Sequence, residues 1–436
     1  MDRRTFLKVT SVAGVVGLAG CGSDEGSRRE SAPTPEVTPT GTPSVTPAEP
    51  DPTPESELTD VSVDVSEGED VSSIVDRITT GERLVFPAGR FTWESPVLVL
   101  EDDWAIRCQE DTVFEVPPGT GDGEKAELLE TNYRGNTADG FVLENLTFDS
   151  PGRAAPGLHL GARNRARVDG LHYVMNAPRS NGWQENGLHA YVENPDGLMR
   201  IDDYRQFNNG DLGAYGRGDS RSGIWVGPKN QGTVHLRNPV LQGFPNNACY
   251  VSRQPGTVVV EGGLLMNNNV SAVRVSGSVE VHNTTVYIDV DRYLEGPGTL
   301  EGPDHNTRGL WGDSRQAGTD GGLVQGVSCI IGSYRRSNGL VSILENPRMT
   351  VRNSQFLLNT AIEGVRAFDG EIELAGCVFD GRSFDATAGV GDITGRANQV
   401  EPHIDPGDVP VGSRIGGFDW HRTHPETPGP CQNCTP

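Results

Sequence analysis

Residues that can react with or bind a ligand recur at the same position of a repeated segment of this chain. Eight short segments begin with Gly or Ala and continue as an alternating run, and successive copies start 24 to 37 residues apart. The third residues of these segments are His159, His189, Trp225, Tyr250, Arg274, Trp311, Val341 and Arg366. Imidazole and phenol groups exchange protons, guanidinium groups pair with carboxylates, and indole faces stack against the C–H surfaces of sugars.

The alternation predicts that each segment is a short β-strand. Side chains point alternately to the two faces of a strand, so the second and fourth residues share one face and the third residue lies on the other. The second residues are apolar, which predicts that they face the interior: Leu158, Leu188, Ile224, Cys249, Val273, Leu310, Leu340 and Val365. The third residues are then expected on the outer face.

A second ladder lies between the copies and marks a repeated bend. Its turn residues are Asn145, Gly170, Asp203, Asn238, Gly262, Asn283, Gly326, Asn353 and Gly376. These three residue types tolerate the left-handed backbone conformation best. The residue three positions later is usually apolar, with Gln206 as the exception. A repeat that cannot bury its own apolar face alone is typical of a solenoid, and three short strands per turn indicate a parallel β-helix.

At this point the chain resembles the right-handed parallel β-helix superfamily that includes pectate lyases and polygalacturonases. The pattern covers about residues 60 to 380, and Leu84 to Trp93 resembles the strand that follows the capping helix in that superfamily. We therefore expect an all-β solenoid of about nine rungs at 58–382. A capping helix is expected at Asp70 to Thr79, where Val71, Ile74, Val75 and Ile78 have helical spacing.

The N-terminal residues predict export. Arg3, Arg4 and Lys8 resemble a twin-arginine motif, and Leu18 to Cys21 resembles a lipobox. We expect a signal peptide at 1–20, a lipid on Cys21, and a Pro- and Thr-rich tether at 21–57 without fixed structure. Such a protein is held on the outer face of the cytoplasmic membrane by its lipid only. A C-terminal extension at 383–436 contains the pair Cys431 and Cys434, for which a local disulfide is favoured over zinc and a tail without fixed structure over both.

The charge narrows the choice of partners. The chain has 60 acidic and 36 basic residues, a net charge of −24. Lysine occurs only at positions 8, 125 and 229, and an acidic, lysine-poor surface fits a haloarchaeal protein in concentrated salt. This charge argues against nucleic acid as a partner. An acidic polysaccharide stays compatible because molar salt screens the repulsion, and we expect a monomer.

The resemblance implies that a polysaccharide lies along the outer face of the repeated strands. Hydrolases of this superfamily use clustered aspartates there, whereas none of the third residues is acidic and Asp313 is the only acid at a fifth position. We therefore expect a lyase, which acts on acidic glycan by β-elimination and needs a base and cations. The expected base is His189 or Lys229 and the proton donor Tyr250. The expected cations are Arg253 and Arg274. The expected sugar contacts are His159, Trp225, Trp311 and Arg366.

Two alternatives to a lyase remain open from the residues alone. A carbohydrate-binding protein needs only the aromatic residues, and a structural component of the cell envelope needs neither a base nor a cation. No cofactor is required by a motif. Ca²⁺ is a candidate, with Asp211, Asp219 and Glu185 in the long loops as ligands, although no spacing motif supports this set.

Overall fold

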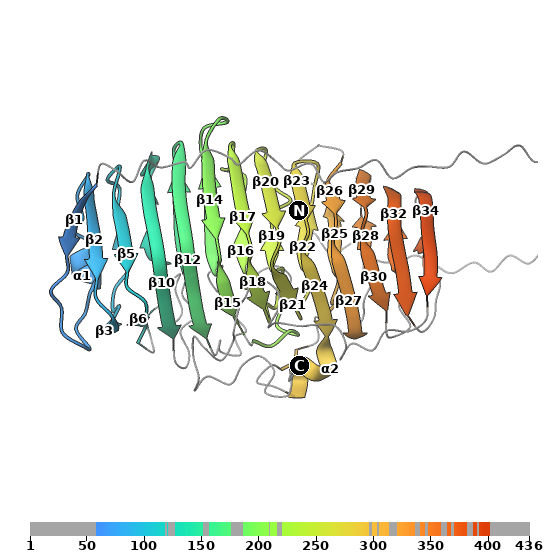
Figure 1. Cartoon of the computed structure of the whole chain (residues 1–436), viewed down its shortest axis with the longest axis horizontal. Helices are drawn as coiled ribbons and strands as arrows, with labels where there is room; N and C mark the ends of the chain where they lie inside the picture. The colour runs from blue at the N-terminus through green and yellow to red at the C-terminus, as the bar shows by residue number, and fades with distance from the viewer. Residues whose placement is uncertain are drawn as a thin grey trace, which may run out of the picture. The chain divides into compact units, whose positions relative to one another are not determined.

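The computed structural model describes residues 58–117, 120, 127–150, 157–175, 186–208, 210–215, 220–295, 299–302, 305–313, 321–335, 341–344, 348–358, 364–367, 370–381, 387–389 and 392–401. The predicted signal peptide, Cys21, the tether and the Cys431–Cys434 pair lie outside these residues. Apart from one short hairpin, every strand pair is parallel, and the strands stack rung upon rung along one axis (Figure 1). The predicted parallel β-helix is confirmed.

Each turn of the β-helix contributes to three columns of strands. The first column contains β1 (Thr59–Ser62), β2 (Glu82–Phe86), β5 (Ala105–Cys108), β10 (Phe141–Ser150), β12 (Arg165–Met175), β14 (Leu198–Asp202), β17 (Thr233–Arg237), β20 (Thr257–Glu261), β23 (Val279–His282), β26 (Leu323–Gln325), β29 (Arg348–Arg352), β32 (Glu371–Gly381) and β34 (Asp392–Glu401). The pairing of β32 with β34 carries this column beyond residue 382, where the β-helix was expected to end.

The second column follows the bend. It contains β3 (Gly89–Thr92), β6 (Thr112–Glu115), the second halves of β10 and β12, β15 (Arg205–Phe207), β18 (Val240–Gln242), β21 (Leu264–Met266), β24 (Thr285–Asp289), β27 (Ser328–Ser333), β30 (Gln355–Leu358) and the second half of β32. A hairpin of β8 (Asn132–Tyr133) and β9 (Asn136–Thr137) and a helix α2 (Val290–Glu295) lie outside the columns.

The third column is an eleven-stranded sheet, which we call sheet B. Its strands are β4 (Val97–Leu98), β7 (Glu127–Glu130), β11 (Gly157–Ala162), β13 (Leu188–Val192), β16 (Ile224–Trp225), β19 (Cys249–Tyr250), β22 (Val273–Val275), β25 (Leu310–Asp313), β28 (Val341–Leu344), β31 (Val365–Ala367) and β33 (Thr387–Gly389). The repeat therefore has more rungs than the nine expected, because the first rungs turn through other residues: Pro87 and Ala88 between β2 and β3, and Gln109 to Asp111 between β5 and β6.

All nine predicted bend residues have a positive φ, between 48° at Asn353 and 73° at Gly170. Asparagine and glycine alternate in most of this ladder, and the Asn side chain lies against the Gly of the next rung. A Cβ atom at Gly262 would lie 2.4 Å from Oδ1 of Asn238. The Asn side chain of one rung thus occupies the space that the Gly of the next rung leaves empty.

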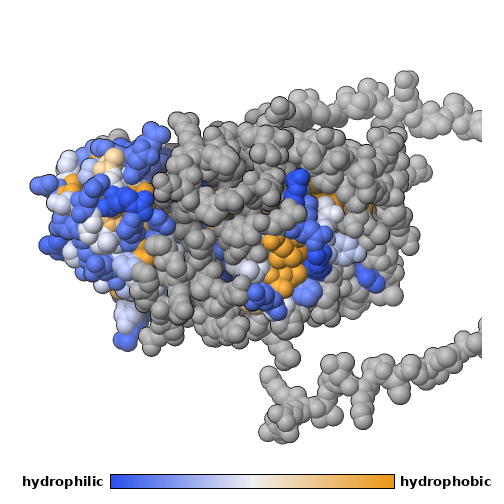
Figure 2. Space-filling model, turned by 90° about the horizontal axis from the view of Figure 1, so that it is seen from below, coloured by the Kyte–Doolittle hydropathy of each residue, from blue (hydrophilic) through white to orange (hydrophobic). Residues whose placement is uncertain are grey.

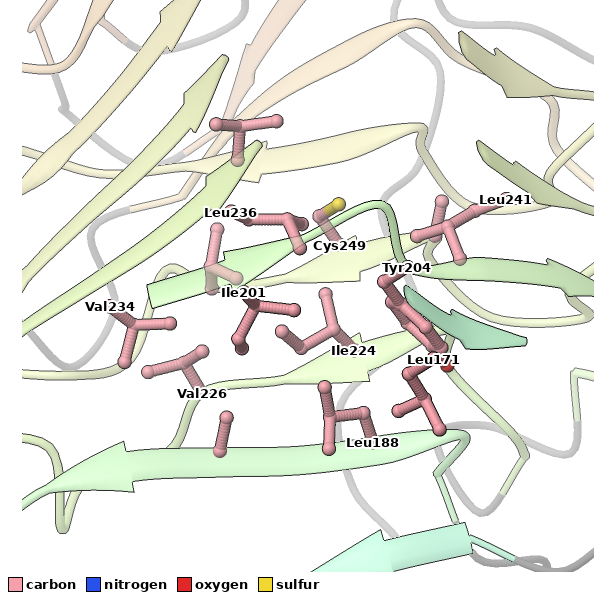
Figure 3. Close-up of a cluster of buried hydrophobic side chains, with 14 of the residues drawn as sticks. Leu171, Leu188, Ile201, Tyr204, Ile224, Val226, Val234, Leu236, Leu241 and Cys249 are labelled. Atoms are coloured by element: carbon pink, nitrogen blue, oxygen red, sulfur yellow. The ribbon is translucent and has the colours of Figure 1, made fainter. Parts of the chain in front are cut away.

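The interior is apolar along the whole column (Figure 3). The expected inward residues Leu158, Leu188, Ile224, Cys249 and Val273 are all buried. Gln206, the exception to the apolar rule, is also buried, and its Oε1 lies 2.5 Å from the Tyr204 hydroxyl. A buried polar group keeps its cost low when it finds a partner inside the core. The described cysteines Cys108, Cys249, Cys329 and Cys377 are free and buried, as expected.

Two sequence-based expectations need correction. The capping helix is shorter than 70–79: α1 spans only Ser72–Val75, although Val71, Val75 and Ile78 are buried against the core as expected. In β28 it is Ser342, and not Val341, whose Cα is in register with Trp311. Val341 pairs with the inward Leu310, so this segment was assigned one residue out of register.

None of the helices described here is long and apolar enough to cross a membrane.

We predict that Gly262→Ala lowers the free energy of unfolding by about 1 to 2 kcal/mol, because an L-residue at φ +69° is strained and its Cβ meets Asn238. Urea denaturation at fixed salt measures the change. Gly68→Ala is the matched control, since φ is +77° there and a Cβ would meet nothing within 4 Å. Equal losses in the two variants would show that the stacked Asn238 contact adds nothing.

Candidate functional site

The outward residues of sheet B form one continuous row. In the register of the sheet, consecutive Cα partners are His159, His189, Trp225, Tyr250, Arg274 and Trp311. Ser342 and Arg366 continue the row beyond Trp311. Adjacent strands lie about 4.8 Å apart, so side chains of neighbouring rungs are in contact with each other. Their contacts divide the row into two groups on either side of Trp225.

The N-terminal group is a stack of aromatic rings. The imidazoles of His159 and His189 are 4.0 Å apart between centroids and nearly parallel, at 18°. The other face of the His189 ring lies 4.3 Å from Trp225. Tyr191, two residues after His189 and therefore on the same face, contacts both histidines, with centroid distances of 5.8 and 5.6 Å. Both faces of the His189 ring are thus covered.

Two glycines make room for the large rings. A Cβ at Gly161 would lie 2.4 Å from the Tyr191 ring, and a Cβ at Gly227 would lie 2.7 Å from Trp225. Each ring therefore leans over a position that has no side chain. The Lys229 ammonium lies 5.1 Å from the centroid of the Tyr191 ring, within cation–π range. Burial raises the pKa of Tyr191 to about 12, so its hydroxyl keeps its proton at neutral pH.

The C-terminal group is rich in cations. The guanidinium of Arg274 lies 4.5 Å from the Tyr250 ring and 4.0 Å from the Trp311 ring. Arg253 lies 5.1 Å from the same Tyr250 ring, and Arg308 lies 4.5 Å from Trp311. Burial raises the pKa of Tyr250, and the charges of Arg274 and Arg253 offset this only in part. Tyr250 is therefore a neutral hydroxyl beside two guanidinium groups.

One carboxylate anchors these arginines. Asp313 Oδ2 lies 2.7 Å from Nη2 of Arg274 and 4.0 Å from Nε of Arg253, and the side chains of Asp313 and Arg274 are only 1% and 2% exposed. The Ser252 hydroxyl lies 3.3 Å from the same oxygen. Burial, together with the charge of Arg274, lowers the pKa of Arg308 to about 10. Within this group two arginines lie within 4.0 Å of the Asp313 carboxylate, and Arg308 lies over the Trp311 ring.

The burial of Arg274 and Trp311 differs from the expectation of an open stripe. Their exposed fractions are 2% and 6%, so both lie beneath the residues around them. Trp225, Tyr250 and Arg253 are half-buried and do reach the surface. Figure 2 shows one face of the molecule, where the described N-terminal rungs at the left carry mainly hydrophilic residues. The cation-rich group lies in a chain whose net charge is −24.

The other predicted residues lie further from the centre of the row. Arg366 is two rungs beyond Trp311, and His159 is at the N-terminal end. Of the predicted calcium ligands, Asp211 accepts hydrogen bonds from the backbone N–H groups of Gly213, Glu301 and Gly302, and so joins two long loops. Asp219 and Glu185 lie outside the described residues.

Sequence reasoning did not single out Tyr191 or Arg308. Tyr191 had a usable signal, because residues two apart on a strand share a face and His189 had already been assigned outward. Arg308 had a weaker one, since it directly precedes a repeated segment but its side chain folds back over Trp311. The position of the Arg308 side chain depends on the path of the loop before β25, and no local sequence pattern predicts that path.

Comparisons with known proteins give little beyond the fold. No protein-family model matches the chain, and no curated protein matches it. One solved structure that does match is described as "a new PL6 alginate lyase complex with trisaccharide". It is 8% identical, with a TM-score of 0.32, and the match covers 81% of this chain and 90% of that chain. Such a likeness carries no information about chemistry, so the site is judged from its own residues.

We predict that Asp313→Asn lowers the free energy of unfolding by about 3 to 5 kcal/mol, because it removes the carboxylate that lies 2.7 Å from the buried Arg274 guanidinium. Thermal or urea denaturation measures the loss. The control is Asp291→Asn, which removes the carboxylate of the partly exposed ion pair with Arg335 and should cost less than about 1 kcal/mol. Similar losses in the two variants would contradict the prediction that the buried carboxylate of Asp313 contributes more to stability than the exposed carboxylate of Asp291.

Proposed function

We propose that this protein binds an acidic polysaccharide along the outer face of sheet B and cleaves it by β-elimination. The observation that carries the proposal is the cation-rich group around Tyr250. Arg253 and Arg274 lie near one carboxylate, Asp313, and Arg308 lies over the Trp311 ring, in a chain whose net charge is −24. Arg253 reaches the surface beside the Tyr250 ring, and a uronate carboxylate fits the bidentate geometry of arginine.

The accessible residues of the cation-rich group define where the carboxylate of the substrate lies. Arg253 is about a third exposed as a side chain, whereas Arg274 is beneath the surface and already paired with Asp313. We therefore assign the direct contact to Arg253. Arg274 acts as a positioning residue that holds the Tyr250 ring and contributes its charge from below. Trp225, one rung away and half-buried, offers a face for the adjacent sugar.

The structure favours Lys229 over His189 as the base. The turns that follow β16 and β19 are stacked directly, since the N–H of Gly256 donates to the carbonyl of Asn230 at 3.0 Å. Lys229 belongs to the first of these turns and Arg253 to the second, and the two turns are about one strand spacing apart. His189 is two rungs from Tyr250, about 10 Å, and both of its ring faces are covered.

The reaction then proceeds at one sugar. Lys229 takes the proton from the carbon beside the carboxylate, and Arg253 stabilises the negative charge that develops there. The C–O bond to the leaving sugar breaks as a C=C bond forms. The leaving oxygen takes the proton of Tyr250, whose pKa is raised by burial and which therefore enters the reaction protonated. Proton exchange with solvent restores both groups.

Binding without cleavage is the second candidate function. One observation favours it: the Lys229 ammonium lies against the Tyr191 ring, and it must leave that position to reach a substrate proton. A binding protein needs only Trp225, Tyr250 and Arg253. The third reading, a rigid structural element of the cell envelope, requires no ligand at all.

We predict that a panel of uronate polysaccharides in molar salt contains a substrate whose product absorbs as an unsaturated uronate. Lys229→Met should abolish product formation and leave binding in place, because it removes the base but keeps the length of the side chain. Arg253→Met should weaken binding by roughly tenfold to a hundredfold, from the loss of a charge-assisted hydrogen bond. Product is measured by ultraviolet absorbance and binding by calorimetry.

The control for both substitutions is Arg352→Met, an exposed residue of β29 on a different column. It should change neither product formation nor binding. Binding without product in the wild-type protein, lost in Trp225→Ala, would replace the lyase by the binding function. No binding to any member of the panel would leave the structural reading.

We also propose that the protein is exported folded and held at the outer face of the cytoplasmic membrane by a lipid on Cys21. Cys21→Ala should then move the protein from the membrane fraction to the medium, because no other anchor is proposed. Cys434→Ser, outside the lipobox, is the control and should stay with the membrane. Immunoblots of the two fractions measure the distribution, and a Cys21→Ala protein that stays membrane-bound would refute the lipid anchor.

A further inference from the structure

A cluster of metal-binding side chains lies at the N-terminal end of sheet B, outside the residues assigned to the reaction. It consists of Glu127 and Glu130 on β7 and His159 on β11. One ligand atom from each lies within 4.8 Å of the others. The imidazole Nδ1 of His159 is 3.3 Å from Oε1 of Glu127, and both side chains are 13% exposed. Glu130 is the Cα partner of His159 on the adjacent strand.

A break in the strand register brings the two carboxylates together. Residues three apart point to opposite faces of a regular strand. In β7, however, Gly157 pairs with Glu127 and the next residue, Leu158, pairs with Leu129, so Leu128 is an extra residue. Leu128 and Leu129 are both fully buried, and Glu127 and Glu130 both lie on the outer face. Bulges of this kind re-aim side chains and are frequent beside functional sites.

The cluster sets two carboxylates beside one imidazole at a half-buried position, in a chain that is strongly acidic. The ring of His159 is held in place by its stack on His189, and its backbone carbonyl accepts a hydrogen bond of 3.0 Å from Thr131. The ligands are therefore supported by neighbouring rungs before any ion arrives, as a metal centre requires.

We propose that Glu127, Glu130 and His159 bind one divalent transition-metal ion, with Zn²⁺ as its chemical type. An imidazole nitrogen with two carboxylate oxygens suits Zn²⁺, which takes such ligands at about 2.0 to 2.2 Å, whereas Ca²⁺ prefers oxygen ligands only. Three protein ligands leave at least one coordination position open on the outer face. His159, expected from the sequence as a sugar contact, is thereby assigned to the metal. This inference does not depend on the proposed polysaccharide.

The test measures binding of the metal alone to the full chain. Cys431 and Cys434 are replaced by serine in every sample, so that thiols there cannot contribute. Calorimetry with ZnCl₂ should give one ion per chain. Glu130→Gln and His159→Ala should each weaken the affinity at least about tenfold, since one of three ligands is lost. Co²⁺ should give a visible absorption spectrum that reports a nitrogen ligand and disappears in His159→Ala.

The control is His282→Ala. His282 lies 2.8 Å from Glu280 in an exposed histidine–carboxylate pair in the first column, where no third ligand joins the cluster among the described residues. This variant should bind Zn²⁺ like the parent protein. Circular dichroism confirms that each variant is folded, and Glu130→Gln preserves side-chain shape if His159→Ala does not fold. Unchanged Zn²⁺ binding in Glu130→Gln and His159→Ala, or no binding in the parent protein, overturns the proposal, as does Ca²⁺ binding that survives in His159→Ala.

Discussion

The left-handed bend between the first and second columns is the constraint on which the rest of the structure depends. Each bend residue fixes where one strand ends and the next begins, and all nine predicted positions have a positive φ. Because side chains alternate along a strand, a slip of one residue would turn every inward side chain outward. The bends therefore hold the interior apolar and, one loop later, hold the row from His159 to Trp311 on the outside.

One buried ion pair, between Asp313 and Arg274, joins two adjacent rungs of this scaffold. Asp313 and Arg274 are both almost fully buried, and their charges pair at 2.7 Å. Arg274 then lies against Tyr250 and Trp311, so a structural ion pair supports the ring that the proposed reaction uses. A hydrophobic replacement could hold the rings equally well, but it would supply no positive charge below Tyr250.

The sequence predicted the fold well because the fold repeats. The bend ladder and the apolar second residues are local signals, and each further copy strengthens the same prediction. Local signals failed where the chain leaves the repeat: at β28, where Ser342 is in register with Trp311 in place of Val341, and in the first rungs, whose corners do not follow the bend pattern of the later ones. The outward row was predicted from alternation alone. The burial of Arg274 and Trp311 depends on loops folding over sheet B, and the convergence of Glu127 and Glu130 depends on a bulge.

The alternation of asparagine and glycine along the bends has a consequence for how such a chain can lengthen. Four Asn–Gly pairs occupy successive rungs, for example Asn283 with Gly326, so the natural unit of duplication is two turns. A single inserted turn with Asn at its bend would place a Cβ against the Asn side chain of the rung before it, where a glycine now leaves room. Asp203 is the exception in the ladder, and its carboxylate is drawn aside to Arg205 and His172 at 2.5 and 3.4 Å. If an odd number of turns were added, we expect one bend side chain to be diverted in the same way. The order of Asn and Gly along the bends therefore records whether turns were added in pairs.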